Sequence, residues 1–312
     1  MNAIALIGAA SGWGAGFRHT EDGPPALKAL GLTDWLARGG VAAEWRAMVE
    51  TERRWHDDRG ITTRSDVFGL VARHSAALAT AVAHTMAERK FPVVIGGDHA
   101  IAMGTWGGVA RGMARRRFGL VWLDAHLDAH TVETTPSMNP HGMGAAALLG
   151  HGERAFLKIC GGAIRPENLC FVGVRSYEAG EMALLKRLGV RIIEMPEVKA
   201  RGIGPCLEEA RFIATADTAG FGITIDLDGF DPKDAPGIGL KCDDGLRAEP
   251  TVAALRDTIA NHPSLKAIEI VEYIPEFDED LRTAHLVRDL LLALRAPARQ
   301  TAPKLDLVGT RA

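Results

Sequence analysis

The sequence predicts an α/β protein built on a mostly parallel β-sheet with helices on both faces. Short apolar runs recur along the chain, and their continuity is typical of strands that are buried on both sides. Segments with apolar residues at helical spacing separate these runs throughout. This alternation is typical of βαβ units and therefore of a doubly wound, mostly parallel sheet.

Each element follows from one of these two patterns. The predicted strands cover residues 3–7, 91–96, 118–123, 169–174, 190–195, 221–226 and 265–271. The predicted helices cover residues 24–30, 67–90, 143–149, 178–188, 205–215, 251–261 and 280–294, and another begins at residue 101. Residues 45–66 are charged and indicate no structure. The tail, 296–312, contains proline and is expected to be loosely held or docked on a neighbour.

Composition sets the broad class. The 312 residues are 47% hydrophobic and 24% charged, with a net charge of −3, which is ordinary for a globular protein. No linker or repeat interrupts the pattern, so residues 1–312 are predicted to form one domain. The only tight basic run, Arg115 to Arg117, is expected to end a helix, and we predict no nucleic-acid partner.

The expected location is the cytoplasm, without membrane contact. The N-terminus lacks a signal-peptide pattern, and no apolar run is long enough to span a bilayer. The four cysteines are far apart in sequence and are expected to be reduced thiols. The Gly8 to Gly16 loop has G-x-G-x-G spacing, which does not fit a dinucleotide-binding motif, and no G-K-[ST] follows it.

Three predicted strands end in groups that bind metals. Asp124, His126 and Asp128 alternate after one strand, so an extended backbone points them the same way. A second strand runs through a Gly-Gly turn to His99, and a third ends in Asp226 and Asp228. Each could alone be a polar turn. Together, at the carboxyl ends of parallel strands, they predict a metal site, because two carboxylates in an apolar strand are costly without a cation.

These motifs resemble the three signatures of the arginase–agmatinase (ureohydrolase) superfamily. They are Gly96-Gly97-Asp98-His99, Asp124-Ala125-His126-Leu127-Asp128, and Asp226-Leu227-Asp228 followed by Gly-Phe-Asp-Pro-Lys-Asp-Ala-Pro-Gly. The resemblance extends over most of the chain. It implies a three-layer α/β/α fold, two Mn²⁺ ions per chain, and hydrolysis of a guanidino compound to urea and an amine. It also suggests a homotrimer or homohexamer.

The resemblance implies a ligand set for each ion. One ion would be held by His99, Asp124, Asp128 and Asp226, and the other by Asp124, His126, Asp226 and Asp228. Asp124 and Asp226 would bridge the two ions. Carboxylates with imidazole and no thiolate suit a hard divalent ion such as Mn²⁺.

Three residues are implied in catalysis. A guanidinium carbon is a poor electrophile, so water must be activated by the two metals before it attacks. Asp128 would accept a proton from that water. Glu272, just past a strand, resembles the carboxylate that pairs with the substrate guanidinium. His141 resembles the histidine that shuttles a proton to the leaving amine or regenerates hydroxide. Alternatively, Glu272 is an ordinary surface carboxylate at a strand end, and His141 is a loop histidine that makes a surface contact.

The loop before His141 predicts the substrate. Thr135, Ser137 and Asn139 resemble the arginase group, in which such side chains hold the α-carboxylate and α-amino group of L-arginine. Substrate contacts are also assigned to His130, Glu178 and Glu272. His130 and Glu178 stand where arginases usually place Asn and Asp, and Leu240 stands in place of Thr.

The function predicted from the sequence is hydrolysis of L-arginine to urea and L-ornithine. An agmatinase, a guanidinobutyrase or another guanidino-acid hydrolase is the alternative within the enzyme class. A non-catalytic metal-binding scaffold is the alternative outside it, and retention of all six ligands together with His141 and Glu272 argues against it.

Overall fold

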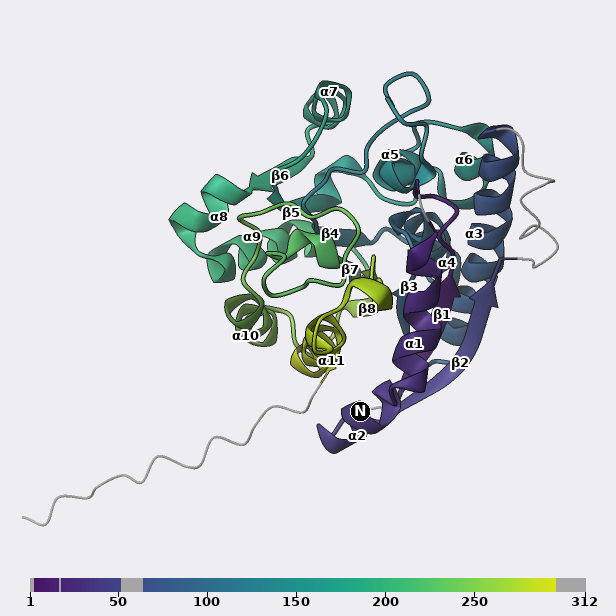
Figure 1. The fold of residues 1–312 in the computed structure, drawn as a ribbon. Coiled ribbons are helices and arrows are strands. Elements are labelled where there is room, and N and C mark those ends of the chain that lie inside the picture. The colour runs from purple at the N-terminus through teal and green to yellow at the C-terminus, as the bar shows by residue number, and fades with distance from the viewer. Residues whose placement is uncertain (1–2, 17, 52–63, 296–312) are drawn as a thin grey trace, which may run out of the picture.

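An eight-stranded sheet organises the chain in the computed structural model, which describes residues 3–16, 18–51 and 64–295. The strand order is β2-β1-β3-β8-β7-β4-β5-β6, and every pairing is parallel. Helices cover the sheet on both sides (Figure 1). The predicted α/β fold class, with three α/β/α layers, is therefore confirmed, and the sheet is parallel throughout its described strands.

The strands are β1 (Ile4–Ala10), β2 (Ala43–Glu50), β3 (Phe91–Gly96), β4 (Gly119–Leu123), β5 (Leu169–Val174), β6 (Arg191–Glu194), β7 (Phe221–Asp226) and β8 (Leu265–Val271). The α-helices are α1 (Gly23–Ala29), α2 (Leu32–Arg38), α3 (Arg64–Ala87), α4 (Ala102–Gly112), α5 (Gly144–Leu148), α6 (Arg154–Cys160), α7 (Ala179–Leu188), α8 (Met195–Arg201), α9 (Ile203–Thr215), α10 (Ala248–Thr258) and α11 (Arg282–Arg295). Short 3₁₀ turns include η4 (His99–Ile101), η5 (Pro140–Met143) and η7 (Leu227–Gly229).

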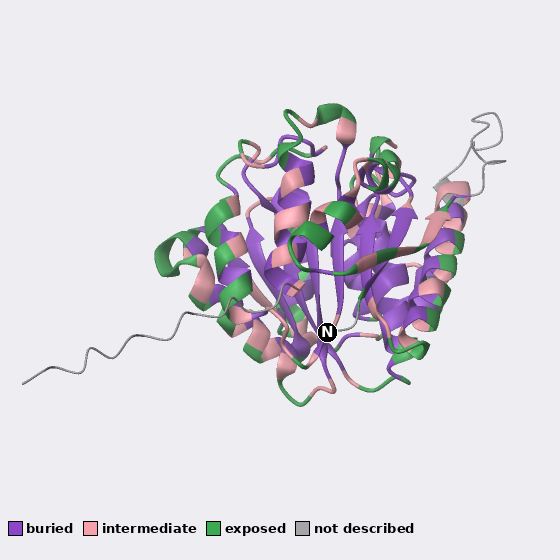
Figure 2. Cartoon of the chain, turned by 90° about the horizontal axis from the view of Figure 1, so that it is seen from below, coloured by how far each residue is buried: buried purple, intermediate pink, exposed green. Residues whose placement is uncertain are grey.

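The apolar runs are continuous because both faces of the sheet are buried. In β4, Val121 and Leu123 pack into the core with α1, α2 and α8 to α11, whereas Leu120 and Trp122 pack into the core with α3 to α7. The alternation of side chains along a strand thus divides one run between two cores. Figure 2 shows the strands as the buried interior beneath partly exposed helices.

Four elements differ from the prediction. Strand β2 begins just before the segment 45–66, whose structure was uncertain from the sequence, and extends into it, and helices α2, α6 and α8 were not predicted. Strand β2 is at the sheet edge, where Glu44 and Arg46 face solvent and interrupt the apolar pattern. The three helices have seven residues each and are too short to show a clear helical period. Residues 52–63 of the segment 45–66 and the tail, 296–312, lie outside the described residues.

The Arg115 to Arg117 run was expected to end a helix, but α4 ends at Gly112 and the run lies in the turn before β4. None of the described helices is both long and apolar enough to cross a bilayer. All four cysteines are free thiols. That the whole chain forms one domain stays a prediction.

The order of the central strands determines where the functional side chains meet. Strands β3, β8, β7 and β4 are successive neighbours, and the predicted metal ligands and Glu272 follow or end these strands. Because parallel strands share one carboxyl edge, residues from four distant parts of the sequence converge there.

Candidate metal centre and active site

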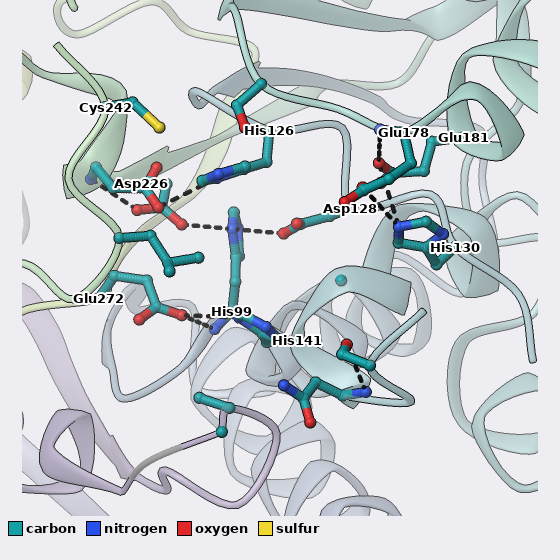
Figure 3. Close-up of a pocket in the computed structure, with 18 of the residues that line it drawn as sticks. His99, His126, Asp128, His130, His141, Glu178, Glu181, Asp226, Cys242 and Glu272 are labelled. Atoms are coloured by element: carbon teal, nitrogen blue, oxygen red, sulfur yellow. Dashed lines mark hydrogen bonds and ion pairs between the residues drawn. The ribbon is translucent and has the colours of Figure 1, made fainter. Parts of the chain in front are cut away.

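The six predicted metal ligands lie together at the carboxyl edge of the sheet. Five of them are buried, and His126 is partly exposed. Two groups form within the set. The His99 cluster consists of His99, Asp124, Asp128 and Asp226, and the His126 cluster consists of His126, Asp124 and Asp228. Figure 3 shows the histidines and carboxylates facing a common centre.

The His99 cluster is formed around one imidazole nitrogen. His99 Nδ1 lies 2.9 Å from Asp128 Oδ2, 3.0 Å from Asp226 Oδ2 and 3.2 Å from Asp124 Oδ2. His99 follows the Gly96-Gly97 turn, in which the chain passes close to β1. A Cβ on Gly97 would lie 1.8 Å from the carbonyl oxygen of Ser11, so glycine is required there.

The His126 cluster shares Asp124 with the first. His126 Nδ1 lies 3.2 Å from Asp228 Oδ2 and 3.4 Å from Asp124 Oδ1. The two oxygens of Asp124 therefore face different histidines. Asp228 lies in the short turn η7, where its backbone N–H donates to Asp226 Oδ1 at 2.8 Å. This geometry gives Asp124 the position of a bridging carboxylate.

The electrostatics of the two groups favour a cation. Burial raises the pKa of Asp226 well above its usual range, and the charges of Asp228 and Asp124 add to that effect. Burial opposes protonation of His99, but the carboxylates of Asp124 and Asp128 beside its Nδ1 outweigh burial and raise the pKa of this imidazole. Four neighbouring carboxylates thus draw positive charge into a buried site.

Buried polar atoms without hydrogen-bond partners also indicate a bound cation. His99 Nδ1, Asp128 Oδ2 and Asp228 Oδ1 are buried and make no hydrogen bond of normal geometry. Buried polar atoms without partners are rare in native proteins. All three belong to residues of the two clusters and are ligand types that divalent cations accept. The residues present therefore fit two hard divalent ions, and Asp124 would be shared between them.

Residues behind the His99 cluster were not predicted. Thr224 donates to Glu269 Oε1 at 2.7 Å, so its oxygen accepts from His99 Nε2 at 3.0 Å. Trp106 Nε1 also donates to Glu269 Oε1, at 3.0 Å, and Trp122 Nε1 donates to Asp124 Oδ2 at 2.8 Å. Because Nε2 carries the proton, Nδ1 of neutral His99 presents its lone pair to the site.

Glu272 and His141 lie at the side of the same centre. Glu272 Oε1 accepts from the backbone N–H of His99 at 2.8 Å and lies 3.8 Å from His141 Nδ1. Burial opposes protonation of His141, but the nearby carboxylate of Glu272 outweighs it and raises the pKa of His141 to about 9. Both residues therefore occupy positions from which they could contact a bound substrate.

Backbone strain is concentrated at two of these side chains. Asp128 has φ of 46° and Glu272 has φ of 67°, although neither is glycine. Left-handed backbone in such residues costs about 1–3 kcal/mol and is maintained only where surrounding contacts require it. For Glu272, the backbone N–H donates to the Gly97 carbonyl oxygen at 2.9 Å, which holds the turn after β8 against the turn after β3.

A cavity of about 440 Å³ opens from the metal centre to solvent. Its deep end is lined by Glu272 and by every cluster residue except Asp124, and its outer end includes Ser137, Asn139, His130 and Glu178. Thr135 does not line it. The Thr135 hydroxyl accepts from the Met138 N–H at 3.0 Å and so holds the loop turn. The structure thus brings together all predicted substrate residues except Thr135.

The outer end contains a third group of titratable side chains, His130, Glu178 and Glu181, of which Glu181 was not predicted from the sequence. His130 Nε2 lies 2.9 Å from Glu178 Oε2 and 3.3 Å from Glu181 Oε2. Burial raises the pKa of Glu181 to about 8. Glu181 and Glu178 also form a capping box at the start of α7, and that Glu-x-x-Glu spacing before an apolar run was a detectable signal.

The sequence matches the arginase family over residues 2–295. The arginase of Bacillus caldovelox is 35% identical over 298 residues, covering 94% of this chain and 98% of that protein. The arginase of Bacillus subtilis (strain 168) is 32% identical over 295 residues, covering 93% of this chain and 97% of that protein. The native structure of the Bacillus caldovelox arginase at pH 5.6 superposes with a TM-score of 0.83 at 34% identity, covering 94% of this chain and 98% of that chain.

These matches confirm the family that the three motifs had indicated. They run through all four strands that supply the candidate centre, and they cover nearly the full length of the relatives. Together with the buried His and Asp groups, they lead to one conclusion. The chain belongs to the arginase family and is a ureohydrolase with a candidate metal site.

Proposed function

We propose that this chain hydrolyses L-arginine to urea and L-ornithine, with two Mn²⁺ ions per chain. The observation that carries the proposal is the arrangement of one cavity. Buried carboxylates and two histidines lie at its deep end, and neutral hydrogen-bonding groups with two glutamates lie at its outer end. A guanidinium needs the first environment, and the α-carboxylate and α-amino groups of an amino acid need the second.

The His99 cluster would hold one ion and the His126 cluster the other, with Asp226 as a second shared carboxylate. Oxygen and imidazole donors without a ligating thiolate favour Mn²⁺ over a structural zinc. When bound, two such ions lower the pKa of water so that it becomes a nucleophile at neutral pH. The protein's contribution is the fixed position of its side chains around that water.

Three side chains would act on the guanidinium end. Glu272 pairs with the substrate guanidinium and orients its carbon toward the metal centre. Asp128, 2.9 Å from His99 Nδ1, is placed to accept a proton from the attacking water. His141, whose pKa is raised to about 9, carries a proton and is placed to pass it to the leaving amine. Water is consumed, the C–N bond to the amine breaks, and urea and L-ornithine leave.

The outer end would recognise the amino acid. Ser137 and Asn139 offer a hydroxyl and an amide to the α-carboxylate, which the negative metal pocket alone would repel. Glu178 offers a carboxylate to the α-amino group, and Glu181, whose pKa is raised to about 8, offers a carboxyl oxygen beside it. A site that hydrogen-bonds a substrate group discriminates against an analogue that lacks the group, by about 10⁴-fold in favourable cases.

One observation favours a second candidate, the hydrolysis of a guanidino acid without an α-amino group, such as guanidinobutyrate. His130 Nε2 lies 2.9 Å from Glu178 Oε2. The imidazole therefore already interacts with the carboxylate that would otherwise bind the α-amino group of the substrate. If this contact persists with substrate bound, the outer end would have less negative charge to offer an amine.

Urea release by the Mn²⁺-loaded protein tests the proposal. L-arginine, agmatine, guanidinobutyrate and guanidinopropionate should be compared by kcat/KM under the same conditions. We expect L-arginine to give the highest value. A higher value for guanidinobutyrate would favour the second candidate and implicate His130, and a higher value for agmatine would contradict an amino-acid subsite. The trimeric or hexameric state stays a prediction for sedimentation analysis.

A further inference from the structure

Arg175 lies directly after β5 and contacts backbone carbonyl groups from several loops. Its Nη2 lies 2.8 Å from the carbonyl oxygen of Asp228 and 2.8 Å from that of Cys242. Four further carbonyl oxygens lie at 3.0 to 3.3 Å, those of Gly173, Gly229, Phe230 and Asp243. The guanidinium is therefore surrounded by backbone acceptors.

The backbone of Arg175 connects to a third loop. The N–H groups of Arg175 and Ser176 both donate to the carbonyl oxygen of Ala125, at 2.9 and 3.0 Å. Ala125 lies between Asp124 and His126 in the loop after β4. One residue thus joins the loop that carries His126, the turn η7 that carries Asp228, and the segment around Cys242.

The chemistry of these contacts requires a guanidinium. The turn η7 has only three residues, and the segment 239–245 has no strand that would pair its carbonyl groups. Five N–H donors in a rigid plane can satisfy several converging carbonyl oxygens at once, whereas an ammonium offers three from a single point. Removal of the guanidinium would take a donor from each of these acceptors, of which the Gly229 carbonyl oxygen would keep the Leu246 N–H, and would free the two segments to move.

All of these contacts concern one half of the metal centre. Asp228 is a member of the His126 cluster, and Cys242 lines the cavity together with His126. Figure 3 shows Cys242 beside His126, on the side of the centre away from His141. None of the Arg175 contacts in the described residues involves His99, Thr224 or Glu269, which support the other half.

We infer that Arg175 is a positioning residue for the His126 cluster and sets the affinity of the ion held there, while the His99 cluster is independent of it. The inference rests on the proposed two-ion site. Changes to residues that orient metal ligands commonly weaken metal binding by about 10–100-fold. We expect an effect of that size on one ion only.

The experiment compares Mn²⁺ binding to the wild-type protein, Arg175→Met and Arg175→Lys, by titration calorimetry and electron paramagnetic resonance. Arg175→Met should bind one ion with wild-type affinity and the second about 10–100-fold more weakly. Its spectrum at one equivalent should be that of isolated Mn²⁺, and the spin-coupled signal of an ion pair should appear only at excess metal. Arg175→Lys, which keeps the charge and some donors, should lie between these two proteins.

Arg191→Met is the matched control. Arg191 donates to the Ile192 carbonyl oxygen at 2.8 Å and pairs with Glu197 and Glu209 at the far edge of the sheet. Its loss should lower the melting temperature and leave both ions bound. Retention of both ions by Arg175→Met with wild-type affinity would overturn the inference, as would equal weakening of both ions. A wild-type protein that binds a single ion would instead overturn the two-ion proposal, and the inference with it.

Discussion

The two halves of the metal centre share Asp124 but are supported differently. Behind the His99 cluster, a chain of side chains runs from His99 through Thr224 to Glu269, and all three are at most 1% exposed. The His126 side chain is 20% exposed, and its neighbour Asp228 lies in a loop turn that Arg175 holds by backbone contacts. One half is fixed by strands, and the other is fixed by one guanidinium between loops.

This difference suggests that the two ions bind with different affinities. The neighbouring strands β7 and β8 hold Thr224 and Glu269 opposite each other in register, and these two residues hold the His99 side chain, so little ordering of this ligand remains when an ion enters. The donors of the His126 cluster depend on two loop segments that must be ordered together. We therefore expect the His99 cluster to bind its ion more tightly and to keep it when the other half is perturbed.

Asp124→Asn should have the largest effect because Asp124 contributes to both halves. Asparagine keeps the shape and an acceptor for Trp122, but it removes the charge that faces both histidines. Substitutions of residues that only orient a metal ligand weaken metal binding by up to roughly 100-fold. Because Asp124 is itself a candidate ligand, the affinity for each of the two ions should fall by more than that, and urea release should be lost. Metal analysis after dialysis checks this, and a protein that keeps one tight ion would show that Asp124 serves only one half.

His141→Ala should lower turnover without disturbing either half. His141 is assigned to proton transfer and contacts Glu272, at 3.8 Å. General acid–base catalysis commonly contributes about 10²–10⁴-fold, so kcat should fall within that range while both ions remain bound. Stopped assays combined with metal analysis measure the two quantities separately. Unchanged turnover would show that His141 is an ordinary loop histidine without a role in proton transfer.

Thr224→Val should weaken the His99 half alone. Valine removes the hydroxyl that accepts from His99 Nε2 and donates to Glu269; buried His99 Nε2 would lose its partner, while Glu269 Oε1 would keep the hydrogen bond from Trp106. We expect one ion to bind about 10–100-fold more weakly and the protein to lose about 1–3 kcal/mol of stability. Thr215→Val is the control, because that hydroxyl only donates to a carbonyl within α9. If the variant bound both ions more weakly by the same factor, the two halves of the centre would not be supported independently, and the comparison would be wrong.

Ser137→Ala should have the smallest effect and should change substrate preference only. Ser137 lines the outer end of the cavity, away from both clusters. Loss of one hydrogen bond to a substrate carboxylate should reduce kcat/KM for L-arginine by about 10-fold. Agmatine, which has no carboxylate, should be affected less. An equal loss for both substrates would indicate that Ser137 only holds its loop, where it accepts from the Asn139 N–H at 3.2 Å.

The sequence identified the residues of both clusters as candidate ligands but missed the support of the His99 half. The rule that carboxylates are rare in strands identified Asp226 and Asp228, and it applies equally to Glu269 within β8. Glu269 went unnoticed because it stands alone, without a second ligand at alternate spacing. The central strands were predictable because they are apolar on both faces. The edge strand β2 was not, because its exposed side interrupts the apolar run.

The support of the other half could not be predicted in this way. Arg175 acts through backbone carbonyl groups of segments 53 to 68 residues away, and backbone groups leave no pattern in a sequence. The approach of His130 to Glu178 depends equally on packing between a loop and the start of α7. Ligands at strand ends are thus predictable from local spacing, whereas loop positions that tune them depend on the fold.

The most direct test of the central claim is a stepwise Mn²⁺ titration of the wild-type protein followed by electron paramagnetic resonance. Two unequal half-sites predict two ions per chain. The first should give the spectrum of an isolated ion and the second should convert it to that of a spin-coupled pair. Saturation at one ion per chain would contradict the account, and so would a coupled signal that appears in full proportion from the first addition.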